Sequence, residues 1–184
     1  MPEIKHQTIT VYLGANESLD PRFEKAAREL GTWIGKSGRR LVYGGSKCGL
    51  MGVLAESVLA AGGRVTGVEP RFFVEMGLVY DDIDELIVTE TMAERKAKMI
   101  ELGDAFIAFP GGTGTLEEIA EVMSAVYLGH MDVPCIVYDL DGYYEGLRIQ
   151  LAKMAETGLS NVSQQRQICF ARTLEEIRAA VEGR

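Results

Sequence analysis

Short apolar runs alternate with longer amphipathic segments along almost the whole chain. The short runs lack polar alternation, which is typical of strands buried on both faces of a parallel sheet. The longer segments repeat apolar residues at helical spacing. The expected strands are 8–13, 41–43, 65–68, 86–88, 104–109, 135–138 and 168–170. The expected helices are 22–38, 50–61, 92–102, 116–128, 143–157 and a last one after Thr173.

This alternation predicts an α/β fold. We expect one Rossmann-like, doubly wound parallel sheet with helices on both faces, and we expect residues 1–184 to form a single domain. The chain shows no internal repeat, linker or low-complexity tract. Residues 69–84 follow neither period, so their structure stays open.

Capping signals support several helix starts. Asp20 followed by Pro21 suits an N-cap and the first helical position. Thr91 with Glu94, and Thr173 with Glu176, fit the S/T-x-x-E capping box.

The most informative turn joins the fifth expected strand to its helix. It reads Pro110-Gly111-Gly112-Thr113-Gly114-Thr115, and a strand, a glycine-rich turn and a helix in this order direct free backbone N–H groups at an anion. No Lys-Ser or Lys-Thr follows, so the turn is not of the nucleoside-triphosphatase type. Residues 111–115 are therefore candidates for binding a phosphate.

Two plainer interpretations stay open at this point. Thr115 and Glu118 also fit a capping box, in which case Glu118 only caps a helix. A second glycine-rich turn, 44–49, follows the second expected strand, and both turns lie at the carboxyl edge of the sheet. The pair favours a nucleotide, and the alternative is that both turns are tight connections with glycines for helix–sheet packing.

Composition limits the partners. The net charge of −8 argues against general binding of nucleic acid or anionic membranes, although a small anion can still bind locally. Cys48, Cys135 and Cys169 form neither a metal pair nor a disulfide framework, so we expect reduced thiols. There is no signal-peptide pattern and no membrane-spanning run, and we expect a cytoplasmic protein.

A phosphate and Glu118 in one site would need a cation. Arg95 and Lys96 lie on the helix that precedes the central strand, beside Met99 on one stripe of that helix. Such a pair is by itself more typical of a solvated helix face.

Taken in order, these motifs resemble a known family. The motifs are Tyr43-Gly44-Gly45, Gly49-Leu50-Met51-Gly52, Met92-x-x-Arg95-Lys96-x-x-Met99 and Pro110-Gly111-Gly112-x-Gly114-Thr115-x-x-Glu118. Their order and spacing resemble the Lonely Guy family, the cytokinin-activating phosphoribohydrolases that are often mislabelled lysine decarboxylases. The resemblance spans about residues 11–146 and includes Asp141-Gly142-Tyr143-Tyr144.

The resemblance implies an enzyme that hydrolyses the N-glycosidic bond of a nucleoside 5′-monophosphate. It assigns the catalytic roles to Arg95 and Glu118. A carboxylate can stabilise an oxocarbenium-like transition state and orient water, and an arginine can hold it ionised. The implied binding residues are Gly45, Ser46, Met51, Lys96, Gly111, Gly112, Thr113, Gly114, Thr115 and Ser124. We expect no cofactor and no metal.

The chain departs from the family pattern around the expected base site. Ser46 replaces a frequent third glycine, Ser124 replaces a threonine, and Ala125 and Tyr127 replace a tryptophan and a glutamine. The base, adenine or an N6-substituted adenine, therefore stays open.

Two rival functions remain at this point. A lysine decarboxylase would need pyridoxal phosphate on a lysine that nothing here marks. A non-catalytic nucleotide-binding or carrier module on the same fold is the stronger rival. The resemblance also implies a homodimer. In addition, the two site helices are rich in apolar residues that could leave a partner face exposed: Met92, Met99, Ile100, Ile119, Val122, Met123 and Val126.

Overall fold

The computed structural model describes residues 6–16, 20–165 and 168–183. Its strands are β1 Thr8–Tyr12, β2 Arg40–Tyr43, β3 Arg64–Pro70, β4 Glu85–Thr89, β5 Ala105–Ala108, β6 Cys135–Tyr138 and β7 Ile168–Ala171. Its helices are α1 Pro21–Lys36, α2 Gly49–Ala60, α3 Arg71–Glu75, α4 Met92–Leu102, α5 Thr113–Tyr127, α6 Glu145–Glu156, α7 Val162–Gln165 and α8 Leu174–Glu182, with a 3-10 turn at Leu140–Gly142.

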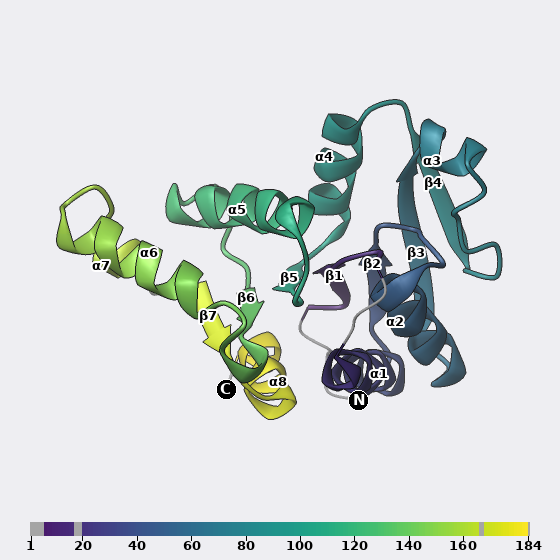
Figure 1. The fold of residues 1–184 in the computed structure, drawn as a ribbon, viewed down its shortest axis with the longest axis horizontal. Coiled ribbons are helices and arrows are strands. Elements are labelled where there is room, and N and C mark those ends of the chain that lie inside the picture. Colours follow the sequence, from purple (N-terminus) through teal and green to yellow (C-terminus); the bar gives the residue numbers. More distant parts are fainter. Residues whose placement is uncertain (1–5, 17–19, 166–167, 184) are drawn as a thin grey trace.

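The strands form one sheet in the order β4-β3-β2-β1-β5-β6-β7. Every neighbouring pair is parallel. The chain moves outward from β1 in one direction, returns, and continues outward from β5 in the other (Figure 1). The predicted doubly wound fold is confirmed, and its topological switch point lies between β1 and β5, where such sheets bind ligands.

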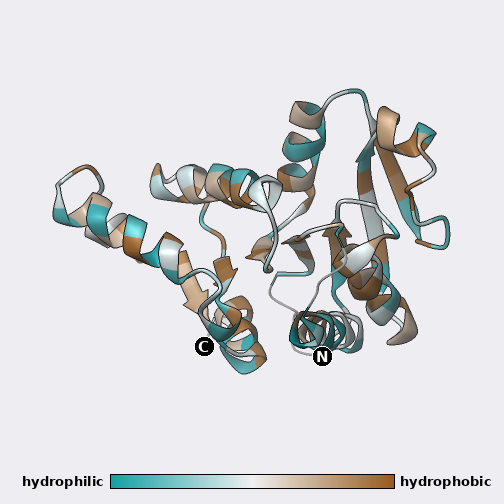
Figure 2. Cartoon of the chain, in the orientation of Figure 1, coloured by the Kyte–Doolittle hydropathy of each residue, from teal (hydrophilic) through white to brown (hydrophobic). Residues whose placement is uncertain are grey.

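Two apolar layers cover the sheet. One face packs against α1, α2 and α8 through side chains such as Leu30, Leu54 and Ile177. The other packs against α4 and α5 through Met99 and Ile119. Figure 2 shows apolar strands between helices of mixed polarity. The inner strands β1, β2, β5 and β6 are thus buried on both faces, whereas the edge strands β4 and β7 are partly exposed.

Three expected helix starts are confirmed. The Asp20 carboxylate accepts a hydrogen bond from the Arg22 backbone N–H. The Thr91 hydroxyl accepts one from Glu94 N–H, and the Thr173 hydroxyl accepts one from Glu176 N–H. These signals are local, which is why sequence alone locates them.

The stretch that sequence left open has a definite structure. β3 continues to Pro70 and leads directly into α3. The chain then crosses the β2–α2 turn, where Ser46 pairs with Val79 and the Tyr80 N–H donates to the Gly45 carbonyl. Residues 76–80 therefore form a flap over one of the two glycine-rich turns.

The expectation of a wide, exposed apolar face on α4 and α5 is mostly wrong. Five of the seven residues proposed for it are buried in the core of the single chain: Met99, Ile119, Val122, Met123 and Val126. Val126 is only 2% exposed and packs toward the sheet, because one helix stripe must cover the strands. Met92 and Leu116 do remain exposed.

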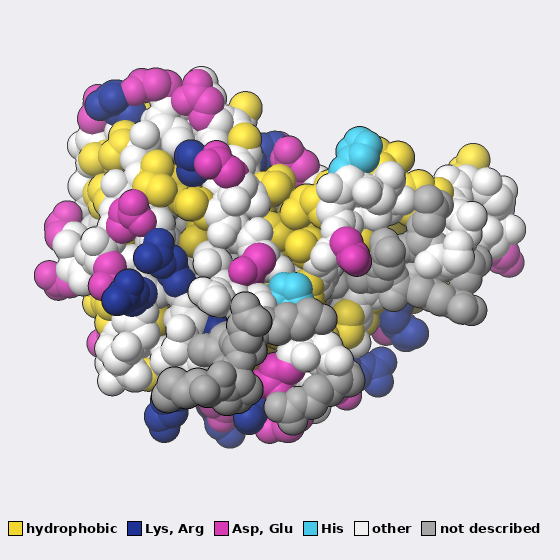
Figure 3. Space-filling view, turned by 180° about the vertical axis from the view of Figure 1, so that it is seen from behind, with side chains coloured by type: hydrophobic (Ala, Val, Ile, Leu, Met, Phe, Trp, Pro, Cys, Tyr) yellow, Lys and Arg dark blue, Asp and Glu magenta, His cyan; other side chains and the backbone are white. Residues whose placement is uncertain are grey.

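The exposed apolar surface lies mainly elsewhere. None of the side chains described in α6 is buried, and α6 with α7 extends away from the sheet (Figure 1). Leu128, Ile149 and Leu159 are each at least 60% exposed. Figure 3 shows apolar atoms gathered between this projecting arm and the body.

Two further observations concern the described part of the chain. All three cysteines are free thiols, as expected. No helix among these residues combines the length and hydropathy that a membrane crossing needs.

Candidate active site

The turn between β5 and α5 forms an open helix amino terminus. α5 begins at Thr113, its N-cap is Gly112, and no side chain caps it. The N–H groups of residues 113–115 have no partner within the helix, because the first turn of any helix lacks carbonyls to receive them. Nothing lies within 4 Å of the space that a side chain at Gly112 or Gly114 would occupy. The predicted anion-accepting turn is present.

The capping-box interpretation of Thr115 and Glu118 is wrong. The helix begins two residues before Thr115, and Thr115 is itself buried. Glu118 lies in the second turn of α5, where its side chain contacts α4. Its partner is a distant residue, which a local pattern does not reveal.

That partner is Arg95. The Arg95 Nη1 donates to Glu118 Oε1 at 2.5 Å, and the two side chains are 5% and 7% exposed. Arg95 Nε donates to the Val68 carbonyl at 2.9 Å, which fixes the guanidinium from the side of β3. A charge-assisted bond at this distance in a buried setting is strong and directional.

The space for Arg95 is provided by Gly44. A Cβ on Gly44 would overlap the Arg95 guanidinium and contact the end of the Met51 side chain. The β2–α2 turn thus contacts the arginine directly. Met51, expected in the site, borders the same space beside Gly44. Gly45 packs against Glu69, and the Ser46 hydroxyl accepts from Cys48 N–H within the turn.

Burial controls the electrostatics of the pair. Removal from water raises the pKa of Glu118, and the Arg95 guanidinium counteracts that rise. A second carboxylate, Glu69, is also buried, and its Oε2 lies 3.8 Å from Arg95 Nε. Sequence reasoning missed Glu69. The only available signal was an acidic residue at the end of an apolar strand.

Two tyrosines brace the anion-accepting turn. The Tyr143 hydroxyl donates to the Gly111 carbonyl at 2.7 Å, and the Tyr144 hydroxyl donates to the Phe109 carbonyl at 2.7 Å. Both tyrosines come from the β6–α6 connection. The Asp-Gly-Tyr-Tyr motif is therefore tied to the turn by hydrogen bonds, a role that sequence did not assign.

Two expected binding residues lie apart from the pair. Lys96 Nζ contacts Glu117 at 2.6 Å and Glu121 at 3.3 Å, so it joins α4 to α5 on the outer side. Ser124 is exposed and lines a groove of about 330 Å³ between α5 and the α6–α7 arm. The structure brings residues 111–115, the β2–α2 turn, Arg95 and Glu118 together, and leaves these two outside.

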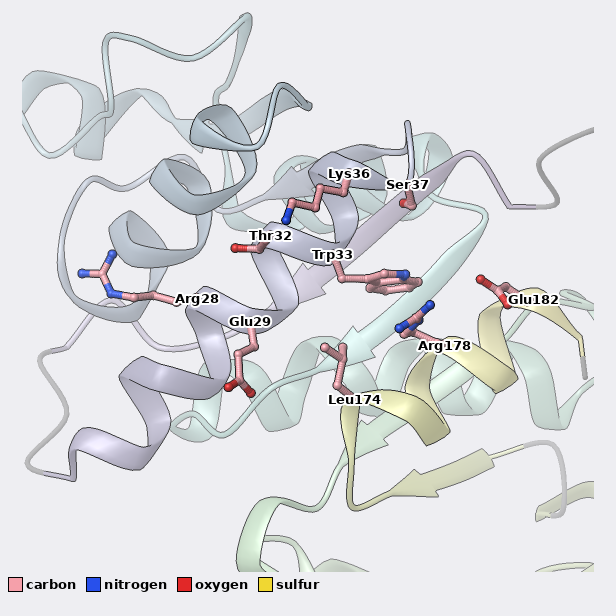
Figure 4. A pocket seen from close by; sticks show the side chains of 9 residues that line it. All are labelled: Arg28, Glu29, Thr32, Trp33, Lys36, Ser37, Leu174, Arg178 and Glu182. Carbon is pink, nitrogen blue, oxygen red and sulfur yellow. The ribbon is translucent and has the colours of Figure 1, made fainter. Parts of the chain in front are cut away.

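A larger cavity lies elsewhere. It has a volume of about 530 Å³ and opens between α1 and α8, lined by Trp33, Lys36 and Arg178 among others (Figure 4). It includes the carboxyl end of α1, which leads into the start of β2, so it lies toward the amino edge of the sheet. The buried arginine–carboxylate pair and the open helix terminus are at the opposite edge, and they define the candidate site.

These features define a class. A doubly wound parallel sheet, an open helix amino terminus at its switch point and a buried carboxylate–arginine pair beside that terminus are suited to a nucleotide. The family model described as "possible lysine decarboxylase" matches residues 51–181.

Curated relatives identify the family. The chain is 37% identical over 178 residues to a cytokinin riboside 5′-monophosphate phosphoribohydrolase of Rhodococcoides fascians, covering 96% of this chain and 90% of that one. It is 39% identical over 173 residues to the enzyme of the same name in Mycobacterium tuberculosis, covering 94% and 92%. The chain belongs to this phosphoribohydrolase family.

A solved structure shares the fold. The molybdenum cofactor binding protein from the phototrophic bacterium Rippkaea orientalis matches with a TM-score of 0.72 over 98% of both chains, at 23% identity. This likeness concerns the fold alone.

Proposed function

We propose that this chain hydrolyses the N-glycosidic bond of a nucleoside 5′-monophosphate, AMP or an N6-substituted AMP. The products are the free base and ribose 5-phosphate. One observation carries the proposal: Glu118, which is paired with the buried Arg95 of α4, belongs to the same helix whose open amino terminus suits a phosphate. Five helical residues separate Thr113 from Glu118, a rise of about 7.5 Å, which is the scale of a ribose phosphate.

The phosphate is held by backbone groups. The N–H groups at 112–115 and the positive end of the α5 dipole favour a dianion at that place. Adenosine should therefore be a far poorer substrate than AMP, and equal rates on both would contradict this assignment.

Glu118 and Arg95 act on the sugar. As the bond from C1′ to the base breaks, positive charge develops on the ribose ring, and the Glu118 carboxylate stabilises it. The same carboxylate takes a proton from the water that attacks C1′, the base leaves with the bonding electron pair, and one proton passes to the base, so that water is added across the bond. Arg95 keeps Glu118 ionised and in position although burial opposes its charge.

The remaining assignments are part of the proposal. Gly45, Ser46 and Met51 border the sugar and base side of the site. Lys96 adds positive charge near the phosphate-binding helix. Ser124 lies too far along α5 to join the same site, so its contribution would come through an adjoining subunit.

The rival is a carrier that binds the nucleotide without cleaving it. A pure binder of an anion has little use for a buried carboxylate beside the phosphate turn, which favours the hydrolase. Chromatographic detection of free adenine from AMP separates the two functions.

The variant Glu118→Gln tests the catalytic role. We expect it to lose base release by about 1,000-fold or more, as removal of a principal electrostatic group does. Its melting temperature should change little, because glutamine can still accept from Arg95 and Glu69, which lies 3.8 Å from Arg95 Nε, can then ionise and supply the negative charge. The matched control is Glu117→Gln on the exposed side of the same helix. Full activity in Glu118→Gln would end the assignment.

We also propose a cytoplasmic homodimer. The support is the exposed apolar surface around the α5–α6 groove together with the position of Ser124 in that groove. Val126 is unsuitable for testing it, because its side chain lies in the core. Light scattering gives the answer, and a mass near 20.2 kDa at micromolar concentration would exclude the dimer.

A further inference from the structure

Glu69 is a buried acid that the proposed reaction does not yet use. It lies at the end of β3, is 4% exposed, and packs against Gly45 of the β2–α2 turn. Its Oε2 atom is 3.8 Å from Arg95 Nε, whereas Glu118 Oε1 is 2.5 Å from Arg95 Nη1, a different nitrogen of the same guanidinium. One arginine therefore serves two buried carboxyl groups.

Charge balance distinguishes the two carboxyl groups. With both ionised, the buried trio would have a net charge of −1, which burial makes costly. With one proton it is neutral. The direct hydrogen bond from Arg95 belongs to Glu118, so Glu118 is the group that is ionised first and Glu69 is the group that keeps the proton.

The pKa values support this order. Burial raises the pKa of Glu69 to about 7, Arg95 opposes the rise, and the charge of Glu118 adds to it. Tyr43 on β2 also faces this region: burial raises its pKa, and the charge of Glu69 adds to the rise. Another titratable group on this side is Tyr80 on the flap, which adds to the rise in the pKa of Tyr43. Neither tyrosine supplies a positive charge to offset an ionised Glu69.

We propose that Glu69 is a positioning residue that sets the upper pH limit of the Arg95–Glu118 pair. The inference rests on the proposed hydrolysis. When Glu69 is protonated, the Arg95 guanidinium interacts with the Glu118 carboxylate alone, and the three side chains together are neutral. Ionised Glu69 competes for the guanidinium and adds a negative charge beside a site that must accept a phosphate. Activity on AMP therefore declines as Glu69 loses its proton.

The first experiment is the pH dependence of kcat/KM for AMP between pH 5.5 and 9. In the unaltered protein we expect a decline above about pH 7 that approaches tenfold per pH unit, the slope of a single ionisation. In Glu69→Gln the amide stays neutral and its oxygen can still accept from Arg95, so the decline should disappear. Glu69→Asp retains an ionisable group and should retain the decline. Glu85→Gln, on the exposed edge strand β4, is the matched control and should follow the unaltered protein.

The second experiment does not depend on the reaction. A folded-state pKa raised above the ordinary value means that the folded protein loses stability as pH rises from about 4.5 to about 7. Glu69→Gln has no such loss. Its melting temperature relative to the unaltered protein should therefore climb across this window and level off above it. Glu69→Leu, also neutral, should behave the same way and serves if the glutamine variant does not fold.

The outcomes separate the two proposals. If the unaltered protein releases no free base at any pH, the proposed hydrolysis and its pH limit are overturned. If the melting temperatures still differ as expected, Glu69 remains the group that holds the proton. Base release with the same alkaline decline in Glu69→Gln and Glu85→Gln would overturn the role of Glu69. A flat melting difference between pH 4.5 and 7 would overturn the placement of the proton on Glu69.

Discussion

The two glycine-rich turns look alike in sequence and differ in structure. In the β5–α5 turn, the spaces beside Gly112 and Gly114 are empty to at least 4 Å. In the β2–α2 turn, the space beside each glycine is filled by the protein itself: Arg95 at Gly44, Glu69 at Gly45, the Asn16 carbonyl at Gly49 and the Lys47 carbonyl at Gly52. The first turn is open at these two glycines, and the second is a packed support for Arg95.

This difference shows what a glycine pattern means. Glycine allows close approach, but the sequence does not say whether the approaching group is a ligand or another part of the chain. The functional interpretation suits Gly112 and Gly114, and the packing interpretation suits Gly111 and much of 44–52. Substitution at single glycines should distinguish the turns clearly.

The largest effect is expected at Gly49. Its φ is +53°, and a Cβ there would overlap the carbonyls of Ala15 and Asn16, which are backbone groups that do not move easily. Gly49→Ala should destabilise the fold by about 3 kcal/mol, since strain and overpacking add. Thermal unfolding should show a melting temperature lower by about 6–12 °C for a chain of this size. An unchanged melting temperature would contradict the packed turn.

The second largest effect is expected for Gly44→Ala, and it should appear in the reaction rate. The added methyl group displaces the Arg95 guanidinium from Glu118, and a misplacement of about 1 Å costs roughly 100-fold in rate. Steady-state kinetics on AMP measure this loss. The control is Gly146→Ala, at a helical glycine of α6 with open space around it and no positive φ. A loss equal to that of the control would mean that Gly44 does not position Arg95.

Gly114→Ala should behave in the opposite way. The position is helical and open, so alanine should leave the fold as stable or stabilise it by about 0.5–1 kcal/mol. The methyl group nevertheless projects where the phosphate approaches, and we expect KM for AMP to rise by about tenfold. The residual activity on adenosine should not change. A similar loss on both substrates would mean that the turn does not hold the phosphate.

The smallest effect is expected at Tyr143. Tyr143→Phe removes the hydrogen bond to the Gly111 carbonyl, worth about 1 kcal/mol. The turn loosens, so KM for AMP should rise by a few-fold while kcat holds. Isothermal calorimetry on a Glu118→Gln background measures the binding change without turnover. Unaltered affinity would show that the tyrosine does not stabilise the turn.

Sequence predicted the parts of the fold that depend on local patterns. The strands, the helices and the caps at Asp20, Thr91 and Thr173 follow from periodicity and from bonds within three residues. The flap at 76–80 was not predictable, because Ser46 and Gly45 hold it from another part of the chain.

In the candidate site, too, sequence predicted what local patterns decide and missed what depends on distant contacts. The capping box at Thr115 failed because Glu118 has a partner on another helix, and the motif resemblance named Arg95 without giving its distance. Sequence could not identify Glu69 as a site residue, because its role depends on the contact between the end of β3, helix α4 and the β2–α2 turn. The apolar stripe on α5 was misassigned because core and partner surfaces use the same residues.

The projecting helix α6 has a consequence for hydrogen exchange. Its described side chains include none that is buried, so little apolar contact holds its amides against opening, and local opening should cost far less free energy than global unfolding. Its amides should exchange with deuterium well before those of α4 or α5. Tyr144, which is buried just before the helix and donates a hydrogen bond to the Phe109 carbonyl, limits this opening. Rapid exchange should therefore not extend to the β5–α5 turn. A second copy seated on the α5–α6 groove would slow exchange in α6, and the protection would increase with protein concentration.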